Sequence, residues 1–322
     1  MKKIIAILSV IICGALAAHC AVLTISSEKQ SFSVEENKGK FEGNVKVQLE
    51  DIHVQSPYAE VTIDESSRQL DEATFFNNPY AYQITGGKKN EIKANILKVS
   101  LLRKVITASG DSQTIVTTEK KPTVIITSDE QEFNTKTNVM TATGGTIIEY
   151  DSIKTFSDKA VAKINSKSDL EHMELIGNAK ITQGNKNTLM ADKFTYTTST
   201  QLAISEGNSY TDLTNENGDR IQVWSNYQQF DRKNNVLMAS GNVRIHYKDY
   251  IAVGPKATVF PDKKTNQLNE VVFTGRVKIT EQARSIEADK IVMYMNPKDF
   301  HAEGNVVTRI RNVNSIQNQK GN

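Results

Sequence analysis

Apolar and polar residues alternate in short runs along most of the chain. Such runs include Val45–Leu49, Ala59–Ile63, Val243–Ile245 and Val277–Ile279, and they are rich in β-branched residues. Because successive side chains of a strand point to opposite faces, a period of two predicts strands with one buried face. Helical spacing is not sustained over three turns, apart from residues 90–102, which fit either a helix or a strand. The chain is therefore expected to be all-β.

Glycine recurs at regular spacing in front of an alternating apolar pair. The glycines of this ladder are Gly43, Gly110, Gly145, Gly177, Gly207, Gly241, Gly275 and Gly304. From Gly110 onward the intervals run from 29 to 35 residues, and the gap before Gly110 fits two periods with a degenerate copy near Phe76-Asn77. A period of about 33 residues indicates tandem units that bury their apolar faces only against their neighbours.

Each unit has an apolar stretch that runs into the glycine and continues beyond it, as in Glu270–Gly275. A glycine inside a strand pattern marks a bend or bulge, because a residue without Cβ adopts those backbone angles at little cost. We therefore expect long strands that are creased at glycine, so that each unit contributes to two facing sheets.

Two further bulges are predicted at Ala-Asp steps. The next apolar residue comes three positions after Ala191 and three after Ala288, which breaks the two-residue alternation. Asp192 and Asp289 are interpreted as bulge carboxylates that cap nearby backbone N–H groups, and not as catalytic groups.

The first residues have the pattern of an export signal. Two lysines precede the apolar run Ile4–Ala18, and small residues follow. This run is shorter than the roughly 20 residues that a membrane-spanning helix needs. Residues 1–21 are therefore expected to be a signal peptide that is cut between Ala17 and Ala21. Two alternatives remain open, namely lipid attachment at Cys20 and retention of the segment as a short inner-membrane anchor.

Composition argues against several classes of protein. The 39 Lys and Arg against 37 Asp and Glu give a net charge of +2, so nucleic acid is not an expected partner. Both cysteines, Cys13 and Cys20, lie in the leader, so no intramolecular disulfide is expected in the mature chain. No metal-ligand spacing, phosphate loop or nucleophile elbow occurs, and we expect no metal, cofactor or catalytic residue. His246 is interpreted as a surface residue, and Trp224 as a packing residue.

The repeated motifs resemble a known family. The pattern Gly-Asn-Val-x-Ile/Val occurs at residues 43–47 and 241–245, and Ile-x-Ala-Asp-x-Ile-x-x-Tyr occurs at residues 286–294. Behind an export signal, these repeats resemble the OstA-like (LptA) family of lipopolysaccharide-transport proteins, over roughly residues 40–310. The resemblance implies a creased, V-shaped antiparallel β jelly roll in the periplasm. It also implies an apolar trough that shelters the acyl chains of lipid A, and end-to-end stacking with other transport proteins of the same fold.

The jelly-roll array is expected to span residues 22–312, and residues 313–322 are expected to be a disordered tail. A division of the array into residues 22–143 and 144–312 is left open. The strands at the two ends, near Val22–Val34 and at Val306–Arg311, are candidate sites for adding a strand from a transport partner or from a second copy, head to tail.

The alternation also nominates residues that line the trough. These are Val45, Val47, Ile147, Ile181, Val243, Ile245, Val277, Ile279 and Val306 in a row next to the creases, and Met190, Phe194, Ile251, Val253, Ile286, Ile291 and Met293 in a facing row. The alternative is that the two rows pack against each other as an ordinary sandwich core.

Three further functions remain open beside a bridging transport protein. They are an inner-membrane-anchored LptC-like subunit, a carbohydrate-active enzyme on a β-helix, and a structural β-repeat protein of the cell surface. The β-helix is disfavoured because its rungs usually repeat every ~20–29 residues in parallel strands.

Overall fold

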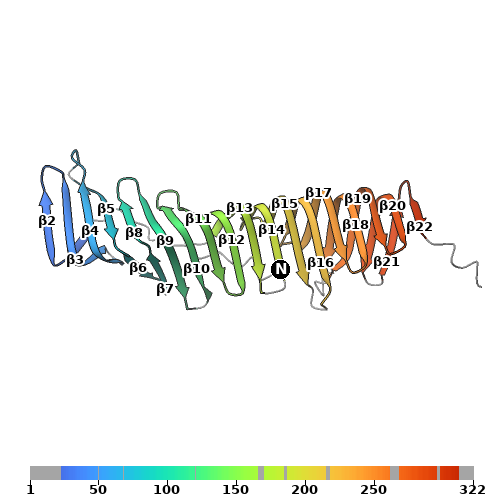
Figure 1. Ribbon diagram of the computed structural model, residues 1–322, viewed down its shortest axis with the longest axis horizontal. Coiled ribbons are helices and arrows are strands. Elements are labelled where there is room, and N and C mark those ends of the chain that lie inside the picture. The colour runs from blue at the N-terminus through green and yellow to red at the C-terminus, as the bar shows by residue number, and fades with distance from the viewer. Residues whose placement is uncertain are drawn as a thin grey trace, which may run out of the picture. The chain divides into compact units, whose positions relative to one another are not determined.

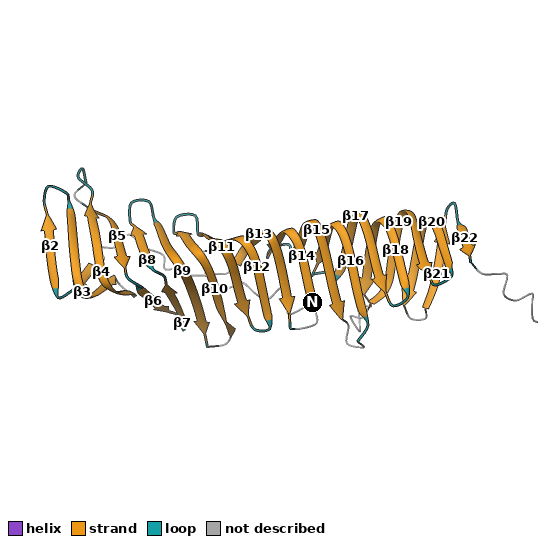
Figure 2. Ribbon diagram, viewed as in Figure 1, coloured by secondary structure: helices purple, strands orange, loops and turns teal. Residues whose placement is uncertain are grey.

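Every regular element of the described residues is a strand, as Figures 1 and 2 show. The computed structural model describes residues 23–49, 51–67, 69–119, 121–165, 170–184, 187–214, 218–261, 268–295 and 298–311. The predicted leader, both cysteines and the predicted tail lie outside these ranges. No helix in the described ranges is long and apolar enough to cross a bilayer. The all-β prediction is confirmed, and residues 90–102 belong to strands and their connections.

The chain divides into two compact units, the first ending at Ala179 and the second beginning at Lys180. The division falls inside β13 (Leu170–Gln183). Unit 1 contains β1 (Leu23–Ser26), β2 (Lys29–Ser33), β3 (Lys38–Leu49), β4 (Ile52–Ile63), β5 (Leu70–Phe76), β6 (Tyr80–Thr85), β7 (Lys88–Lys93), β8 (Ile96–Ser100), β9 (Val105–Thr118), β10 (Lys121–Asn134), β11 (Val139–Tyr150) and β12 (Ile153–Ile164). Unit 2 contains β14 (Asn187–Thr197), β15 (Leu202–Thr214), β16 (Arg220–Asp231), β17 (Val236–Tyr247), β18 (Tyr250–Pro261), β19 (Leu268–Glu281), β20 (Arg284–Met295), β21 (Lys298–Glu303) and β22 (Val307–Ile310).

Strands that follow one another in unit 2 pair antiparallel from β14 to β20. The register shifts near the middle of each pair, so each long strand has two straight halves on either side of a bulge. The last long strand, β20, pairs with β22 through its first half and with β21 through its second half. The two sets of halves form two walls that are joined along the line of bulges, which we call the crease.

Unit 1 has the same plan, but at two places between β4 and β9 a pair of short strands takes the place of one long strand. The first half of β4 pairs with β6, and its second half pairs with β5. Then β8 and β7 pair with the first and second halves of β9. From β9 to β12 the strands are again long, antiparallel and shifted in register near the middle.

In each strand the crease is made by two successive residues with positive φ, which we call a crease pair. The pairs are Gly43-Asn44, Gly110-Asp111, Gly144-Gly145, Gly177-Asn178, Gly207-Asn208, Gly241-Asn242, Gly275-Arg276 and Gly304-Asn305. The degenerate copy expected near Phe76-Asn77 is Asn77-Asn78, with φ of 63° and 61°. Asparagine tolerates this region better than most residues, because its short side chain bonds locally. The creased jelly roll with its repeat of about 33 residues is thus confirmed.

A polar side chain of the neighbouring strand segment covers most of the crease glycines. A Cβ on Gly144 would lie 2.2 Å from Asp129 Oδ2, and a Cβ on Gly207 would lie 2.1 Å from Asp192 Oδ2. Asp192 also accepts a hydrogen bond of 3.1 Å from Asn208 Nδ2. Asp289 likewise accepts a hydrogen bond from the side-chain amide of Asn305. Each of the two predicted bulge aspartates therefore covers a neighbouring crease glycine and bonds the asparagine that follows it.

The adjacent glycines of one crease allow a matched test. We expect Gly144→Ala to lower the free energy of unfolding by about 2–4 kcal/mol, because alanine is strained at φ 80° and its Cβ collides with Asp129. Gly145→Ala should cost only about 1–2 kcal/mol, since its φ is also positive but no atom lies within 4 Å of the new Cβ. Urea denaturation measures both, and equal losses would contradict the covering role of Asp129.

Candidate functional site

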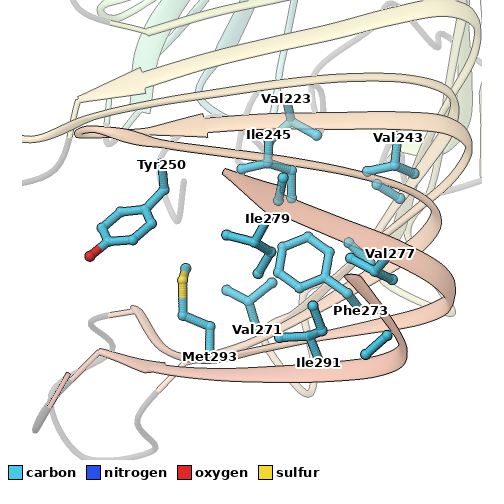
Figure 3. Packing of buried hydrophobic residues seen from close by; sticks show 14 residues of the cluster. Val223, Val243, Ile245, Tyr250, Val271, Phe273, Val277, Ile279, Ile291 and Met293 are labelled. Atoms are coloured by element: carbon cyan, nitrogen blue, oxygen red, sulfur yellow. The ribbon is translucent and has the colours of Figure 1, made fainter. Parts of the chain in front are cut away.

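The interior of unit 2 holds an apolar cluster built from both walls. Val243 and Val277, directly after their crease pairs, have exposed fractions of 0%, and Phe273 on the other wall has 1%. Figure 3 shows the strands curving around these side chains, with Val243 and Val277 near the bend and Tyr250 and Met293 away from it. In this structure, side chains from the two walls therefore fill the space between them.

The edge of this interior that lies away from the crease is closed by one set of contacts, which we call the rim contact. It consists of Tyr250 and Glu281, on the wall formed by the first half of β18 and the second half of β19, and of Lys298 and Phe300 on β21. The Tyr250 and Phe300 rings lie 5.3 Å apart, and Lys298 Nζ lies 4.0 Å from the centre of the Tyr250 ring. Lys298 Nζ also lies 3.9 Å from Glu281 Oε1.

The rim contact contains an ionised carboxylate. A hydrogen bond from the Tyr250 hydroxyl, followed by one from Arg284, holds the pKa of Glu281 below its usual value. Arg284 Nη2 lies 2.6 Å from Glu281 Oε2. Glu281 therefore stays charged at neutral pH and attracts Lys298 across the rim. Such ion pairs at the surface contribute little, at most about 1 kcal/mol, because water screens them.

Unit 1 has its own apolar cluster, built around Phe41, Val45, Phe75 and Leu97. A small pocket of about 20 Å³ lies nearby, between β7, β9, β10 and β11. Its lining combines apolar side chains, among them Phe133, with Thr114 and Gln131. A volume of this size holds about one water molecule and no acyl chain.

Buried polar side chains brace the crease of unit 1. Gln131 Nε2 donates to the backbone carbonyls of Ser112 and Ile126, and Gln131 Oε1 accepts from Thr114 Oγ1 at 2.5 Å. Gln228 makes the corresponding bonds in β16 of unit 2. Both glutamines are almost fully buried, and all their bonds tie neighbouring strand segments together. The sequence signal for them is a repeated Gln-x-Phe followed by Asn or Asp, at residues 131–134 and 228–231.

The structure brings about half of the nominated trough residues into the two apolar clusters. Val243, Ile245, Val277, Ile279, Ile291 and Met293 lie in the cluster of unit 2 with Ile286 packed against it, and Val45 lies in the cluster of unit 1 with Val47 packed against it. Ile181 and Phe194 are buried as well.

The remaining five nominated residues lie elsewhere. Met190, Ile251, Val253 and Val306 are exposed, with exposed fractions of 36–49%. In the first half of β18 the buried residues are Tyr250 and Ala252, so Ile251 and Val253 lie on the outer face. Ile147 is half-buried between the buried Thr146 and Ile148, because the crease pair is Gly144-Gly145 and the first inward residue is therefore Thr146.

Several interior residues were not nominated from the sequence. Val271 and Phe273 form the second wall of the cluster in unit 2, and Tyr250 completes its rim. The sequence does contain a signal for Val271 and Phe273. They occupy every second position before Gly275, just as Val277 and Ile279 occupy every second position after it. Counting in steps of two on both sides of a crease identifies them.

The outer face of unit 2 carries an aromatic ladder. The Trp224 ring lies 5.1 Å from Tyr210 and 4.9 Å from His246. Burial against this ladder, and then the charge of Arg244, lower the pKa of His246. Trp224 packs on neighbouring strands as interpreted, and His246 is half-buried on the outer face. Within the described ranges, no three His, Cys, Asp or Glu side chains come together in a group that could hold a metal ion.

Units 1 and 2 each contain a strand that has an open edge and exposed apolar residues. All residues of β2 and β22 are exposed, including Phe32 in the first and Ile310 in the second. Among the described residues, β2 pairs only with β3, and β22 pairs only with β20. One side of each backbone is thus open to another strand.

Comparisons with known proteins leave the family of the chain unassigned. No protein-family model and no curated protein matches it. One solved structure that aligns with it is LptH of Pseudomonas aeruginosa, described as the LptA homologous periplasmic component of the conserved lipopolysaccharide transport device. The alignment has a TM-score of 0.33 and 10% identity, and it covers 38% of this chain and 82% of that chain. A TM-score this low does not support the transfer of a function to this chain.

Proposed function

We propose that the protein binds the acyl chains of lipopolysaccharide between its two walls and carries this lipid through the periplasm. One observation carries the proposal: the apolar interior of unit 2 lies between two walls that share creased strands and otherwise meet through side chains. The walls can part by rotation at the crease without breaking a hydrogen bond between neighbouring strands. Lipid then occupies the place where the walls now touch each other.

The energy balance favours acyl chains as the ligand. Separating the walls exposes apolar side chains such as Phe273 and Ile291, and each buried methylene of a lipid returns about 0.8 kcal/mol. The rim contact opposes opening only weakly, since its ion pair is partly exposed and its aromatic contact is a single tilted pair of rings. Water alone does not compensate for the exposed apolar surface, so the empty protein closes as in this structure.

The proposal includes the setting of the protein. Residues 1–21 direct export, and the protein works in the periplasm without a cofactor, a metal or a catalytic residue. Its partners are lipopolysaccharide and other transport proteins of the same fold.

Isolation of the protein from cell envelopes in a mild detergent tests whether it binds lipopolysaccharide. Lipopolysaccharide that co-purifies in a fixed molar ratio is the expected result, and protein without any bound lipopolysaccharide would contradict the proposal.

The open edges support bridging by end-to-end strand pairing. In β22 the backbone N–H of Arg311 bonds Ala283 O, so alternate residues toward the N-terminus bond β20 in the same way. Thr308 lies between these positions, and its N–H therefore points away from β20. A strand from a second protein gains hydrogen bonds at this edge.

Proline at position 308 tests this edge. We expect Thr308→Pro to abolish head-to-tail assembly or capture of a partner of the same fold, because proline removes one outward N–H and leaves the pairing with β20 in place. Thr308→Ala is the matched control and should assemble normally. Sedimentation velocity over a concentration series measures assembly. Unchanged assembly of Thr308→Pro would exclude this edge as the junction.

A further inference from the structure

Three buried hydroxyl groups of unit 1 have no hydrogen-bond partner. They belong to Thr146 in β11 and to Thr155 and Ser157 in β12, with exposed fractions of 1%, 1% and 5%. Thr146 lies directly opposite Ser157 in the strand register, and Thr155 lies two residues from Ser157. The three side chains are therefore neighbours on the inner face of one wall, next to the crease.

The fold does not require hydroxyl groups at these positions. The same positions carry Ser209 and Ser225 at the crease Gly207-Asn208, but at the crease Gly241-Asn242 the residue that directly follows the pair is Val243, and it lies opposite Gly254. The residue two positions before Gly254 is Ala252. The same strand geometry is thus built with apolar residues and glycine, and a buried hydroxyl without a partner costs free energy that these residues avoid.

The surroundings of the hydroxyls suit an apolar ligand that carries an oxygen. On the other side of the crease, the buried residues of the same two strands include Ala142, Ala160 and Ala162, whose side chains are single methyl groups. Farther from the crease on the wall of the hydroxyls, Ile148 and Ile153 are buried. A polar group at the crease is thus flanked by hydrocarbon.

We propose that Thr146, Thr155 and Ser157 form a polar subsite that hydrogen-bonds the hydroxyl of a hydroxyacyl chain. The ligand class is then a lipid whose acyl chains carry a hydroxyl group. This inference rests on the proposed function, because the walls of unit 1 must part to admit the chain. The hydroxyl is both donor and acceptor, and so are the three side chains, which permits several bonds at once.

Two ligands of equal length test the subsite. Calorimetric titration of the delipidated full chain compares myristate with hydroxymyristate, whose hydroxyl is on the third carbon. We expect one class of sites to bind hydroxymyristate about tenfold more tightly than myristate. This factor is the gain from roughly one net hydrogen bond to the buried hydroxyl groups. The triple variant Thr146→Val, Thr155→Val, Ser157→Ala should bind both ligands with the affinity that the unmodified protein has for myristate. Thr141→Val, on the outer face of β11, should keep the preference.

Each outcome decides a separate claim. Equal affinity of the unmodified protein for the two ligands would overturn the subsite and leave lipid binding intact. Binding of neither ligand would overturn the proposed function itself. If the triple variant does not fold, the preference of the unmodified protein still decides the question. A preference that survives in a folded triple variant would place the contact elsewhere and would also overturn the inference.

Discussion

Phe273→Ala is expected to lower the free energy of unfolding of unit 2 by about 3–5 kcal/mol, the cost of removing a buried phenylalanine and leaving a cavity. Phe273 is one of the largest fully buried side chains, and it lies in the cluster with Val277 and Ile291. Its loss removes contacts from both walls at once. Urea denaturation followed by circular dichroism measures the change, with the slope of the transition as a check that the unfolded state is unaltered.

The matched control is Phe260→Ala in β18. Phe260 has an exposed fraction of 39% and lies outside the cluster, so its loss should cost less than about 1 kcal/mol. The two variants remove the same side chain from strands of the same unit. Losses of similar size would show that the interior of unit 2 is not the packed core that stabilises it.

Locking the rim is expected to reduce lipid uptake by unit 2 to background. In a chain with Cys13 and Cys20 replaced by serine, Tyr250→Cys and Phe300→Cys place two thiols where two rings now lie 5.3 Å apart. A short bifunctional maleimide then joins the walls. Because rotation at the crease separates these two positions, the joined protein cannot open. Uptake is measured with lipopolysaccharide that is photo-crosslinked from position 279.

Two controls separate locking from damage to the protein. The double-cysteine variant without the reagent, and each single-cysteine variant treated with a monofunctional maleimide, should still take up lipid. They lose the same aromatic contact but remain able to open. Undiminished uptake by the joined protein would mean that lipid does not enter past the rim formed by Tyr250 and Phe300.

The sequence predicts the crease better than it predicts the interior. Positive φ is tolerated by few residues, so a glycine, most often followed by asparagine, marks the creases, and even Asn77-Asn78 follows the predicted period. Alternation is less informative where both faces carry apolar residues. Tyr250-Ile251-Ala252-Val253 is a continuous apolar run, and its pattern does not show which two residues point inward.

Register and buried polarity explain the other differences. Gly144-Gly145 offers two starting points for the crease pair, and counting from the second glycine moves the first inward position from Thr146 to Ile147. Gln131 was not nominated because a hydrophobic pattern assigns polar residues to the surface, whereas Gln131 is buried with its hydrogen bonds satisfied. Such residues are visible in the sequence only through repetition.

The central claim is that the two walls part and admit acyl chains between them. Its most direct test is photo-crosslinking in cells from a diazirine analogue of isoleucine at position 279, inside unit 2. The same group at Lys248, which is exposed at a strand connection outside the cluster, is the control. The account predicts covalent adducts with lipopolysaccharide from position 279 and none from position 248. Adducts from position 279 that contain only protein would contradict it.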